Sequence, residues 1–173
     1  MCIRTVDNSH LAVTFEDGSL SFFDLKGGKE VAGLRTSFFA HPALALSCSD
    51  SCGLIAGAGA EIAAFQLCLS DHTLTELERF EGCGGSKPGV AMLSVREGGR
   101  SGLVAAACWD RRVRLWHVPR LAKARARPAR PLAVLRLHSD SVAAVAWART
   151  VPRRLASSGP DGKIAVWRVF AEE

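Results

Sequence analysis

The sequence contains no apolar run long enough to cross a membrane. Its apolar stretches are short and interrupted, whereas a spanning helix needs about 20 consecutive apolar residues. The opening Met1 to Arg4 is not followed by the long apolar stretch of a secretory signal peptide. We therefore expect a protein of the cytoplasm or the nucleus, with no membrane partner.

Metal-binding patterns are also missing. No two cysteines form a C-x-x-C pair, and the nearest pair, Cys48 and Cys52, has no further His or Cys at a useful spacing. A zinc site needs four such ligands, so we expect neither a metal nor a cofactor. The six cysteines are therefore expected to be reduced, mostly buried thiols of an intracellular protein.

Motifs for catalysis are absent as well. The sequence has no G-x-S-x-G, no phosphate-binding glycine loop and no H-E-x-x-H. Ser139 stands beside His138 and Asp140, but a catalytic triad is defined by geometry rather than by adjacency. We expect a protein that is not an enzyme.

A sequence motif repeats four times, at 11–25, 53–67, 102–118 and 155–169. Each copy is a short apolar run, a tight polar or glycine turn, and an alternating run that ends in an aromatic residue. The closing aromatics are Phe23, Phe65, Trp116 and Trp167, spaced by 42, 51 and 51 residues. A period of about 40–45 residues is typical of a WD-type β-propeller blade, and longer spacings indicate longer loops.

A constant offset supports this interpretation. The closing aromatic lies six residues after an aspartate in three copies. These pairs are Asp17 with Phe23, Asp110 with Trp116, and Asp161 with Trp167. Only Phe23 is followed by an aspartate, so the signature is degenerate.

Each copy of the motif is flanked by further candidate strands, which gives an inner strand, two middle strands and an outer strand. The sequence therefore predicts an all-β fold, a single partial WD-repeat β-propeller over 1–173. The predicted blades are approximately 1–36, 37–84, 85–137 and 138–173, and the last lacks an outer strand.

The number of blades suggests part of a larger ring. Most WD propellers resemble closed rings of seven, and this chain has no strand before its first blade to complete the last one. We interpret it as the C-terminal half of such a ring, from a truncated gene model, a fragment or a splice product. The alternative is a four-bladed ring. An open half would expose unpaired strand edges and an apolar blade face.

Charge is distributed unevenly. Residues 1–86 carry 5 basic and 11 acidic residues, net −6, and residues 87–173 carry 17 basic and 6 acidic residues, net +11. A Pro/Arg-rich loop insertion at 119–131 suggests a contact for phosphate or an acidic partner, or simply a solvated loop. No aromatic interleaves its basic residues to stack on bases, which weakens the case for nucleic acid. Those residues are Arg120, Lys123, Arg125, Arg127 and Arg130.

A polar network is expected in the last blade. In WD repeats a histidine before the inner strand bonds the turn aspartate, which links through a Ser or Thr to the blade tryptophan. His138, Asp161 and Trp167 match three of these places. Gly159 occupies the Ser/Thr place, two residues before the aspartate, so we expect an incomplete network. In the third blade that place is Cys108.

A binding rim is expected where the turns between middle strands gather. Trp109 lies at such a turn, close to Arg111 and Arg112. An exposed tryptophan flanked by arginine has the composition of an interface hot spot. The alternative is that Trp109 packs over the neighbouring blade.

Several blocks resemble the G-protein β-subunit-like WD-repeat family, whose fungal relatives are described as ASTRA-associated proteins. The blocks are 1–4, 16–19, 23–25, 87–91, 108–114 and 131–135. The resemblance implies a non-enzymatic scaffold in a multi-protein complex. It would act with the TTT co-chaperone in maturing phosphatidylinositol-3-kinase-related kinases, or in an ASTRA-type assembly that regulates chromatin. The alternative is an RNA- or phosphate-binding module that uses the basic C-terminal half.

Overall fold

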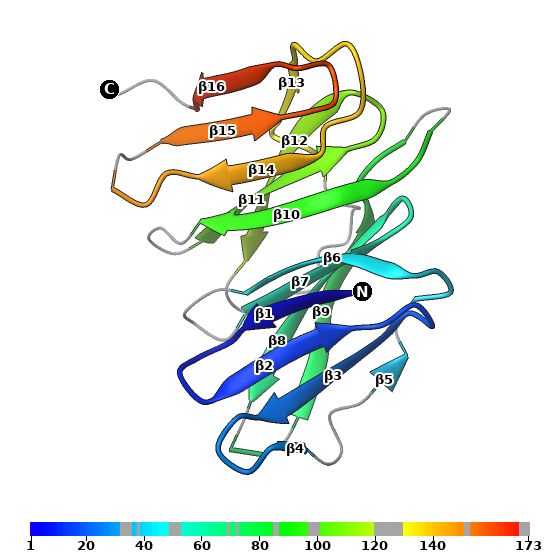
Figure 1. Ribbon diagram of the computed structural model, residues 1–173, viewed down its shortest axis with the longest axis vertical. Coiled ribbons are helices and arrows are strands. Elements are labelled where there is room, and N and C mark those ends of the chain that lie inside the picture. The colour runs from blue at the N-terminus through cyan, green and yellow to red at the C-terminus, as the bar shows by residue number, and fades with distance from the viewer. Residues whose placement is uncertain are drawn as a thin grey trace.

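The structure is a computed structural model of the 173-residue chain. It describes residues 1–31, 36–37, 39–48, 53–68, 70–71, 73–84, 87–96, 101–119, 130–150 and 153–169. These residues form antiparallel strands in four sheets and no helix (Figure 1). No helix of the described ranges is long and apolar enough to span a membrane.

The first two sheets follow one another along the chain. The first has the order β1-β2-β3-β4, and β5 also pairs with β3. Its strands are β1 (Cys2–Thr5), β2 (His10–Thr14), β3 (Ser19–Asp24), β4 (Lys29–Glu30) and β5 (Thr36–Ser37). The second has the order β6-β7-β8-β9. Its strands are β6 (Ala43–Cys48), β7 (Gly53–Ala58), β8 (Glu61–Cys68) and β9 (Thr73–Glu81).

The third and fourth sheets repeat this meander. The third is ordered β10-β11-β12-β13, and the fourth is ordered β14-β15-β16 over the described residues. Their strands are β10 (Val90–Arg96), β11 (Ser101–Cys108), β12 (Arg112–Pro119), β13 (Ala133–Arg136), β14 (Ala144–Trp147), β15 (Arg154–Ser158) and β16 (Ile164–Arg168). The predicted all-β architecture of a partial β-propeller is confirmed. The described residues of the fourth sheet form three strands.

The tight turns between middle strands depend on left-handed backbone. Gly18 and Gly162 follow the turn aspartates and have φ of +76° and +72°. Glycine adopts such angles without a steric penalty from a Cβ atom. At Gly18 a side chain is doubly excluded, because a Cβ there would lie 2.1 Å from the Phe39 carbonyl oxygen. Arg111 occupies the same turn position in the third blade with φ of +71°.

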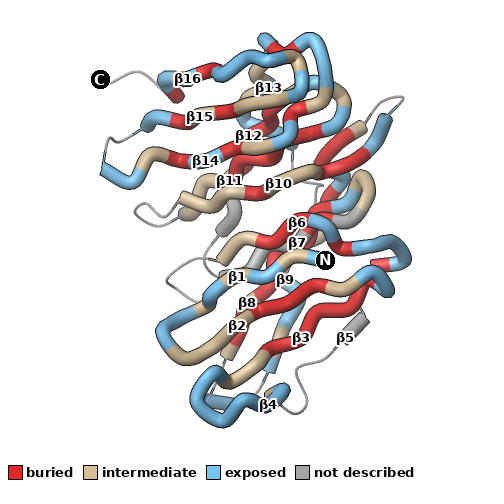
Figure 2. Tube along the Cα trace, in the orientation of Figure 1, coloured by how far each residue is buried: buried red, intermediate tan, exposed pale blue. Residues whose placement is uncertain are grey.

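The sheets stack face to face, and apolar cores lie between them (Figure 2). Alternate residues of each middle strand point to opposite faces, so one strand supplies two cores. In β12, for example, Trp116 packs toward the second blade whereas Leu115 packs toward the fourth. Phe22 and Phe65 fill the core between the first two blades.

The inner strands β1, β6, β10 and β14 are neighbours in series, and hydrogen bonds of side chains bridge the blades there. Thr14 Oγ1 donates to the Ala43 carbonyl at 2.7 Å, and Ser47 Oγ accepts from the Val95 amide at 3.1 Å. The Ser94 carbonyl accepts from Trp147 Nε1 at 3.1 Å. Each bridge satisfies a polar group inside the blade junction and so favours one orientation of the adjoining blades.

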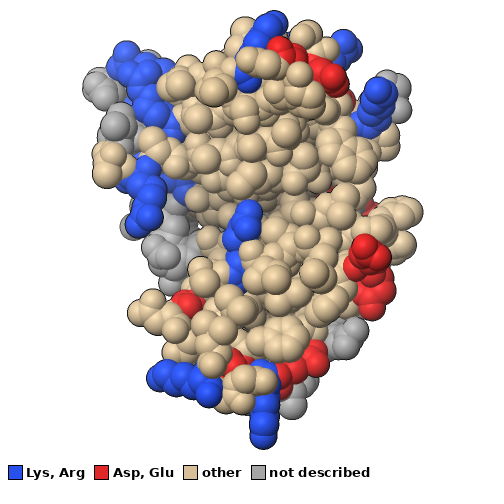
Figure 3. All heavy atoms as spheres, viewed as in Figure 1, with Lys and Arg blue, Asp and Glu red and all other residues tan. Residues whose placement is uncertain are grey.

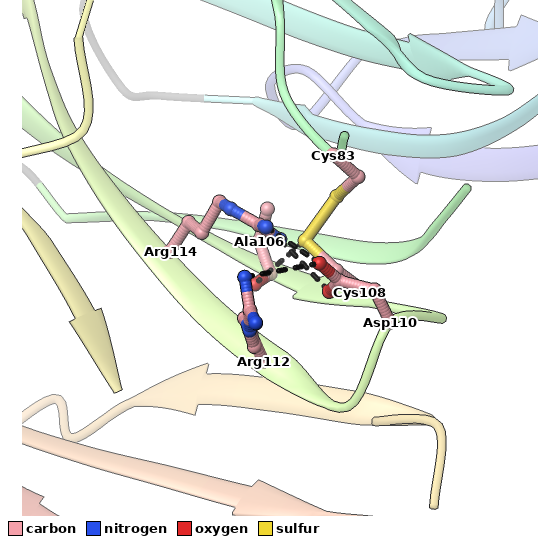
Figure 4. Close-up of a disulfide and its surroundings, with 6 residues drawn as sticks. All are labelled: Cys83, Ala106, Cys108, Asp110, Arg112 and Arg114. Carbon is pink, nitrogen blue, oxygen red and sulfur yellow. Dashed lines mark hydrogen bonds and ion pairs between the residues drawn. A yellow bond between two sulfur atoms is a disulfide. The ribbon is translucent and has the colours of Figure 1, made fainter. Parts of the chain in front are cut away.

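A disulfide joins the second and third blades. Cys83 follows β9 and Cys108 ends β11; both are fully buried, and their Cα atoms lie 6.1 Å apart (Figure 4). The expectation of reduced thiols is therefore wrong for these two residues. Sequence inspection missed the pair because the two cysteines come from different blades and meet only when the blades stack.

Other cysteines remain free thiols. Cys2, Cys48 and Cys68 are unpaired among the described cysteines, and each is partly buried. Burial raises the pKa of the Cys48 thiol to about 12. Because the thiolate is the nucleophile, this thiol is unreactive at neutral pH.

Candidate protein-interaction surface

The fourth blade contains a buried polar network. His138 Nδ1 lies 3.1 Å from the Asp161 carboxylate, and His138 Nε2 lies 2.9 Å from Ser157 Oγ. Trp167 Nε1 donates to the same Ser157 oxygen at 2.8 Å. Because a carboxylate only accepts, the Nδ1–H of the histidine donates to Asp161, and Ser157 then donates to Nε2. The chain of bonds satisfies every member and ties the turn to the blade tryptophan.

The serine of this network is not where the sequence analysis placed it. The expected position was Gly159, and the expectation of an incomplete network is wrong, because Ser157 supplies the hydroxyl. Gly159 is close to the backbone instead: a Cβ there would lie 2.5 Å from the Ser141 carbonyl oxygen. Gly159, two residues before the aspartate, therefore leaves room for the Ser141 backbone to approach the turn closely.

The Asp161 carboxylate is held in its charged form. Burial by itself raises the pKa of this group, but hydrogen bonds from the Ser139 amide, His138 and the Lys163 amide outweigh that effect. The pKa is lowered from the ordinary 3.8 to about 2. Such contacts stabilise a turn rather than prepare a catalytic acid, which would need a raised pKa.

We expect the Asp161 contribution to stability to be complete above about pH 4 and lost as the pH falls toward 2, because folding lowers its pKa. Urea midpoints measured between pH 5 and pH 2 should therefore fall less steeply for Asp161→Asn than for the parent chain. Glu16→Gln, which changes an exposed carboxylate, is the control and should follow the parent. Parallel curves for Asp161→Asn and the parent would contradict the assignment.

The other blades replace this network with different contacts. At the 51-residue offset, Ala106 stands where the fourth blade has Ser157. Trp116 Nε1 is accordingly buried without a hydrogen-bond partner. Asp110 instead binds the nearly buried Arg114 guanidinium through two bonds of 2.8 and 2.5 Å (Figure 4).

The first blade uses a local contact at its turn. Asp17 accepts from the amide and hydroxyl of Ser19 at 2.9 and 2.5 Å. Phe23, at the tryptophan position, has no ring N–H to donate. The predicted aspartates thus lie at equivalent turns and the predicted aromatics in the strands that follow. Among the described residues, a bonded set of His, Asp, Ser and Trp is found in the fourth blade.

The predicted rim residues lie together on the β11–β12 turn. The Trp109 indole rests on Gly89, where a Cβ would lie 2.0 Å from ring atom Cε3, and the Trp109 amide donates to the Gly89 carbonyl at 2.9 Å. Trp109 therefore packs over its own blade and remains 38% exposed. Lys87 and Pro88, which directly precede Gly89 in the sequence, are exposed.

The two predicted arginines have different surroundings. Arg111 is exposed at the tip of the turn in left-handed backbone. Arg112 is partly exposed, with its guanidinium 4.0 Å from the Asp110 carboxylate. Trp109 and Arg111 thus present an aromatic face and a cation on one turn.

The basic loop falls mainly outside the described residues. Arg120, Lys123, Arg125 and Arg127 lie there, and Arg130 is described and exposed. Among the described ranges, no three His, Cys, Asp or Glu side chains gather in a way that could hold a metal ion.

Residues 129–168 match the family model described as WD domain, G-beta repeat. This window contains the whole His138–Asp161–Ser157–Trp167 network. The chain folds as a β-propeller and contains a WD repeat. The match includes the blade whose turn and tryptophan are joined by hydrogen bonds. Other residues stand at one or more of these places in the first three blades, such as Phe23, Phe65 and Ala106.

A curated relative covers most of this propeller. The guanine nucleotide-binding protein subunit beta-like protein 1 of Mus musculus is 26% identical over 160 residues, which is 92% of this chain and 44% of the relative. The propeller therefore spans less than half the length of that protein. It resembles the G-protein β-subunit-like family, as the sequence blocks indicated.

Solved structures show the same fold. The β-propeller domain of Cps50 (Swd1) from Myceliophteria thermophila has a TM-score of 0.77 and 16% identity, covering 98% of this chain and 53% of that chain. A chain of the mitotic checkpoint complex has a TM-score of 0.71 and 15% identity, covering 95% of this chain and 47% of that chain. The computationally designed Ika4 protein has a TM-score of 0.66 and 14% identity, covering 95% of this chain and 88% of that chain.

Proposed function

We propose that this chain is a non-enzymatic adaptor that binds a protein partner through the Trp109–Arg111 turn. The observation that carries the proposal is Arg111, a large residue in left-handed backbone at an exposed tip. A propeller is commonly a platform for partners, and its function resides in specific surface residues rather than in the fold.

The strain at Arg111 favours a functional role. Left-handed backbone costs a residue with a Cβ roughly 1–2 kcal/mol. Glycine fills the equivalent position in the first and fourth blades, at Gly18 and Gly162. Strained residues of this kind concentrate at binding and switching sites. The third blade therefore has an arginine at the turn position where the first and fourth blades have glycine, which adopts this angle without strain.

The support beneath Trp109 favours the same role. Its ring packs against Gly89, so its position is set before a partner arrives. A rigid aromatic loses little conformational entropy on binding, and tryptophan with arginine is the composition enriched at interface hot spots. The nearby Asp110 is already neutralised by Arg114, so it does not compete for Arg111.

The class of partner comes from the resemblance. Likeness to a G-protein β-subunit-like protein supports a role with the TTT co-chaperone in maturing phosphatidylinositol-3-kinase-related kinases, or in an ASTRA-type complex linked to chromatin. Either role places the protein in the cytoplasm or the nucleus. Both roles need a scaffold surface and no catalytic residues.

The test uses affinity recovery of TTT subunits and kinases by the tagged protein in cells. Trp109→Ala should weaken recovery about tenfold or more, the loss expected of a hot-spot residue. Arg111→Gly should also weaken recovery while leaving the melting temperature unchanged or higher, because it removes the side chain and relieves the strained angle.

Arg149→Ala is the control for the loss of one exposed arginine, since Arg149 lies on the fourth blade away from this turn. It should bind as the parent does. Normal recovery by both Trp109→Ala and Arg111→Gly would place the interface elsewhere. Unfolding by Trp109→Ala alone would show that the indole is structural.

A second candidate is binding to RNA or phosphate through the C-terminal half. Exposed basic side chains gather on its described part, and Figure 3 shows Lys and Arg mostly around the upper half of the molecule. These residues are Arg130, Arg136, Arg149, Arg153, Arg154 and Lys163. RNA binding that falls steeply with added salt would favour this function over the adaptor.

A further inference from the structure

The outer face of the fourth blade carries exposed apolar side chains that no described residue covers. Its residues alternate along β14–β16 and point away from the third blade, because the intervening Val145 and Leu155 are buried in the core with that blade. Ile164 and Val166 on this face are 79% and 69% exposed, the highest values among the large apolar residues that the structure describes. We define the fourth-blade outer face as Ala146, Ala156, Ser158, Ile164 and Val166.

The internal repeat shows what such a face is built to contact. Moving back 51 residues, Ile164 and Val166 correspond to Val113 and Leu115 of the third blade. Those two residues are fully buried, because the fourth blade packs on them. The small residues Ala156 and Ser158 likewise correspond to the fully buried Ala105 and Ala107. The fourth-blade outer face therefore has the composition of a blade–blade junction.

The first blade presents the complementary kind of face. Its outer face consists of Ile3, Leu11, Val13 and Phe23, which alternate with the residues buried against the second blade. Ile3 is 49% exposed and Leu11 and Phe23 are partly exposed, whereas Val13 is buried. Phe23 occupies the repeat position of Trp116, which packs against the preceding blade. A blade face with an aromatic at this position is the one that receives the neighbouring blade inside this molecule.

Charge favours contact between these two faces. Arg154 and Arg168 lie on the fourth-blade side that carries Val166, as the strand register shows, whereas Glu30 is paired with Phe23 on the first-blade side. The same opposition extends over the whole chain, with net −6 for residues 1–86 and net +11 for residues 87–173. Opposite potentials orient two surfaces and suppress contacts between like faces.

We propose that the fourth-blade outer face binds the first-blade outer face of a second copy of this chain. Each copy supplies one face of each kind, so two copies related by a two-fold axis satisfy both contacts and close a ring without leaving an open filament. The inference depends on the fold and the strand register and is independent of the adaptor function.

Light scattering coupled to size exclusion tests the proposal on the 173-residue chain. The chain has a mass of 18.5 kDa, so we expect one discrete species of about 37 kDa by doubling, the stoichiometry of a two-fold assembly. Ile164→Lys with Val166→Lys should raise the dimer Kd at least about thirtyfold, the effect of a hot-spot loss. Both residues are exposed in one copy, so the monomer should stay folded by circular dichroism.

The control and the reverse face make the test decisive. Leu132→Lys with Leu137→Lys adds the same charge at exposed apolar positions outside both faces and should leave the dimer intact. Ile3→Lys should dissociate the dimer as the fourth-blade variant does. A folded monomer for the parent chain would overturn the proposal. A dimer that survives Ile3→Lys but not the fourth-blade substitutions would show pairing of like faces and overturn it too.

Discussion

Replacing Trp116 with alanine is expected to lower the free energy of unfolding by about 3–5 kcal/mol, the range for removing a fully buried aromatic. Trp116 is completely buried between the second and third blades, with its ring centroid 5.3 Å from that of Phe80. The substitution leaves a cavity at a junction that cannot close without moving a whole blade. Urea unfolding followed by circular dichroism at one fixed protein concentration gives the measurement.

Phenylalanine substitutions separate packing from hydrogen bonding. Trp116→Phe removes an indole N–H that has no partner, so it should cost much less than Trp116→Ala. Trp167→Phe removes the donor to Ser157, so it disturbs the fourth-blade network. A parent-like stability for Trp116→Ala would show that the core between the second and third blades does not depend on this ring.

Loss of the Cys83–Cys108 disulfide is expected to cost about 3–4 kcal/mol, from the loop-closure entropy of the unfolded chain. The bond spans 25 residues and joins two blades. The double variant Cys83→Ala with Cys108→Ala should show this loss in urea, and a reducing agent should change the parent but not the variant. Because both cysteines are fully buried, reduction of the parent should be slow until the blades open.

A matched variant and a chemical assay complete the test. Cys68→Ala removes a partly exposed free thiol and should leave stability and its response to reductant unchanged. Alkylation of the unreduced, unfolded chain followed by mass spectrometry should label Cys2, Cys48 and Cys68 but not the bonded pair. Labelling of Cys83 and Cys108 under those conditions would contradict the disulfide.

The polar network shows where inference from sequence succeeds and where it stops. Spacing predicts Asp161 and Trp167, likeness to WD repeats predicts His138, and the structure brings all three together through Ser157. The serine was misplaced by two residues. Ser157 lies opposite Ala165 in the ladder, so Trp167 is its diagonal neighbour on the same face. Diagonal pairs across two strands are within reach of long side chains, and spacing along one strand does not reveal them.

The predicted rim also combines features that the sequence indicates with features that only the folded blade shows. Trp109 and Arg111 were chosen from composition at a turn, and the turn exists. The support of the indole by Gly89 and the left-handed angle of Arg111 depend on the packed blade. Neither could be deduced from residue type, because arginine is an unfavourable choice for that angle.

The sequence alone determined the all-β class, the four repeats, the order of strands within each blade and the tight turns at Gly18 and Gly162. Alternation with a period of two and the preferences of turn residues are local properties, so they can be read from neighbouring residues. Only the tertiary structure decided the Cys83–Cys108 bond, the place of Ser157 and the exposure of Ile164 and Val166. Those features arise when blades stack, because stacking brings together residues from separate repeats and decides which strand faces are buried in the described structure.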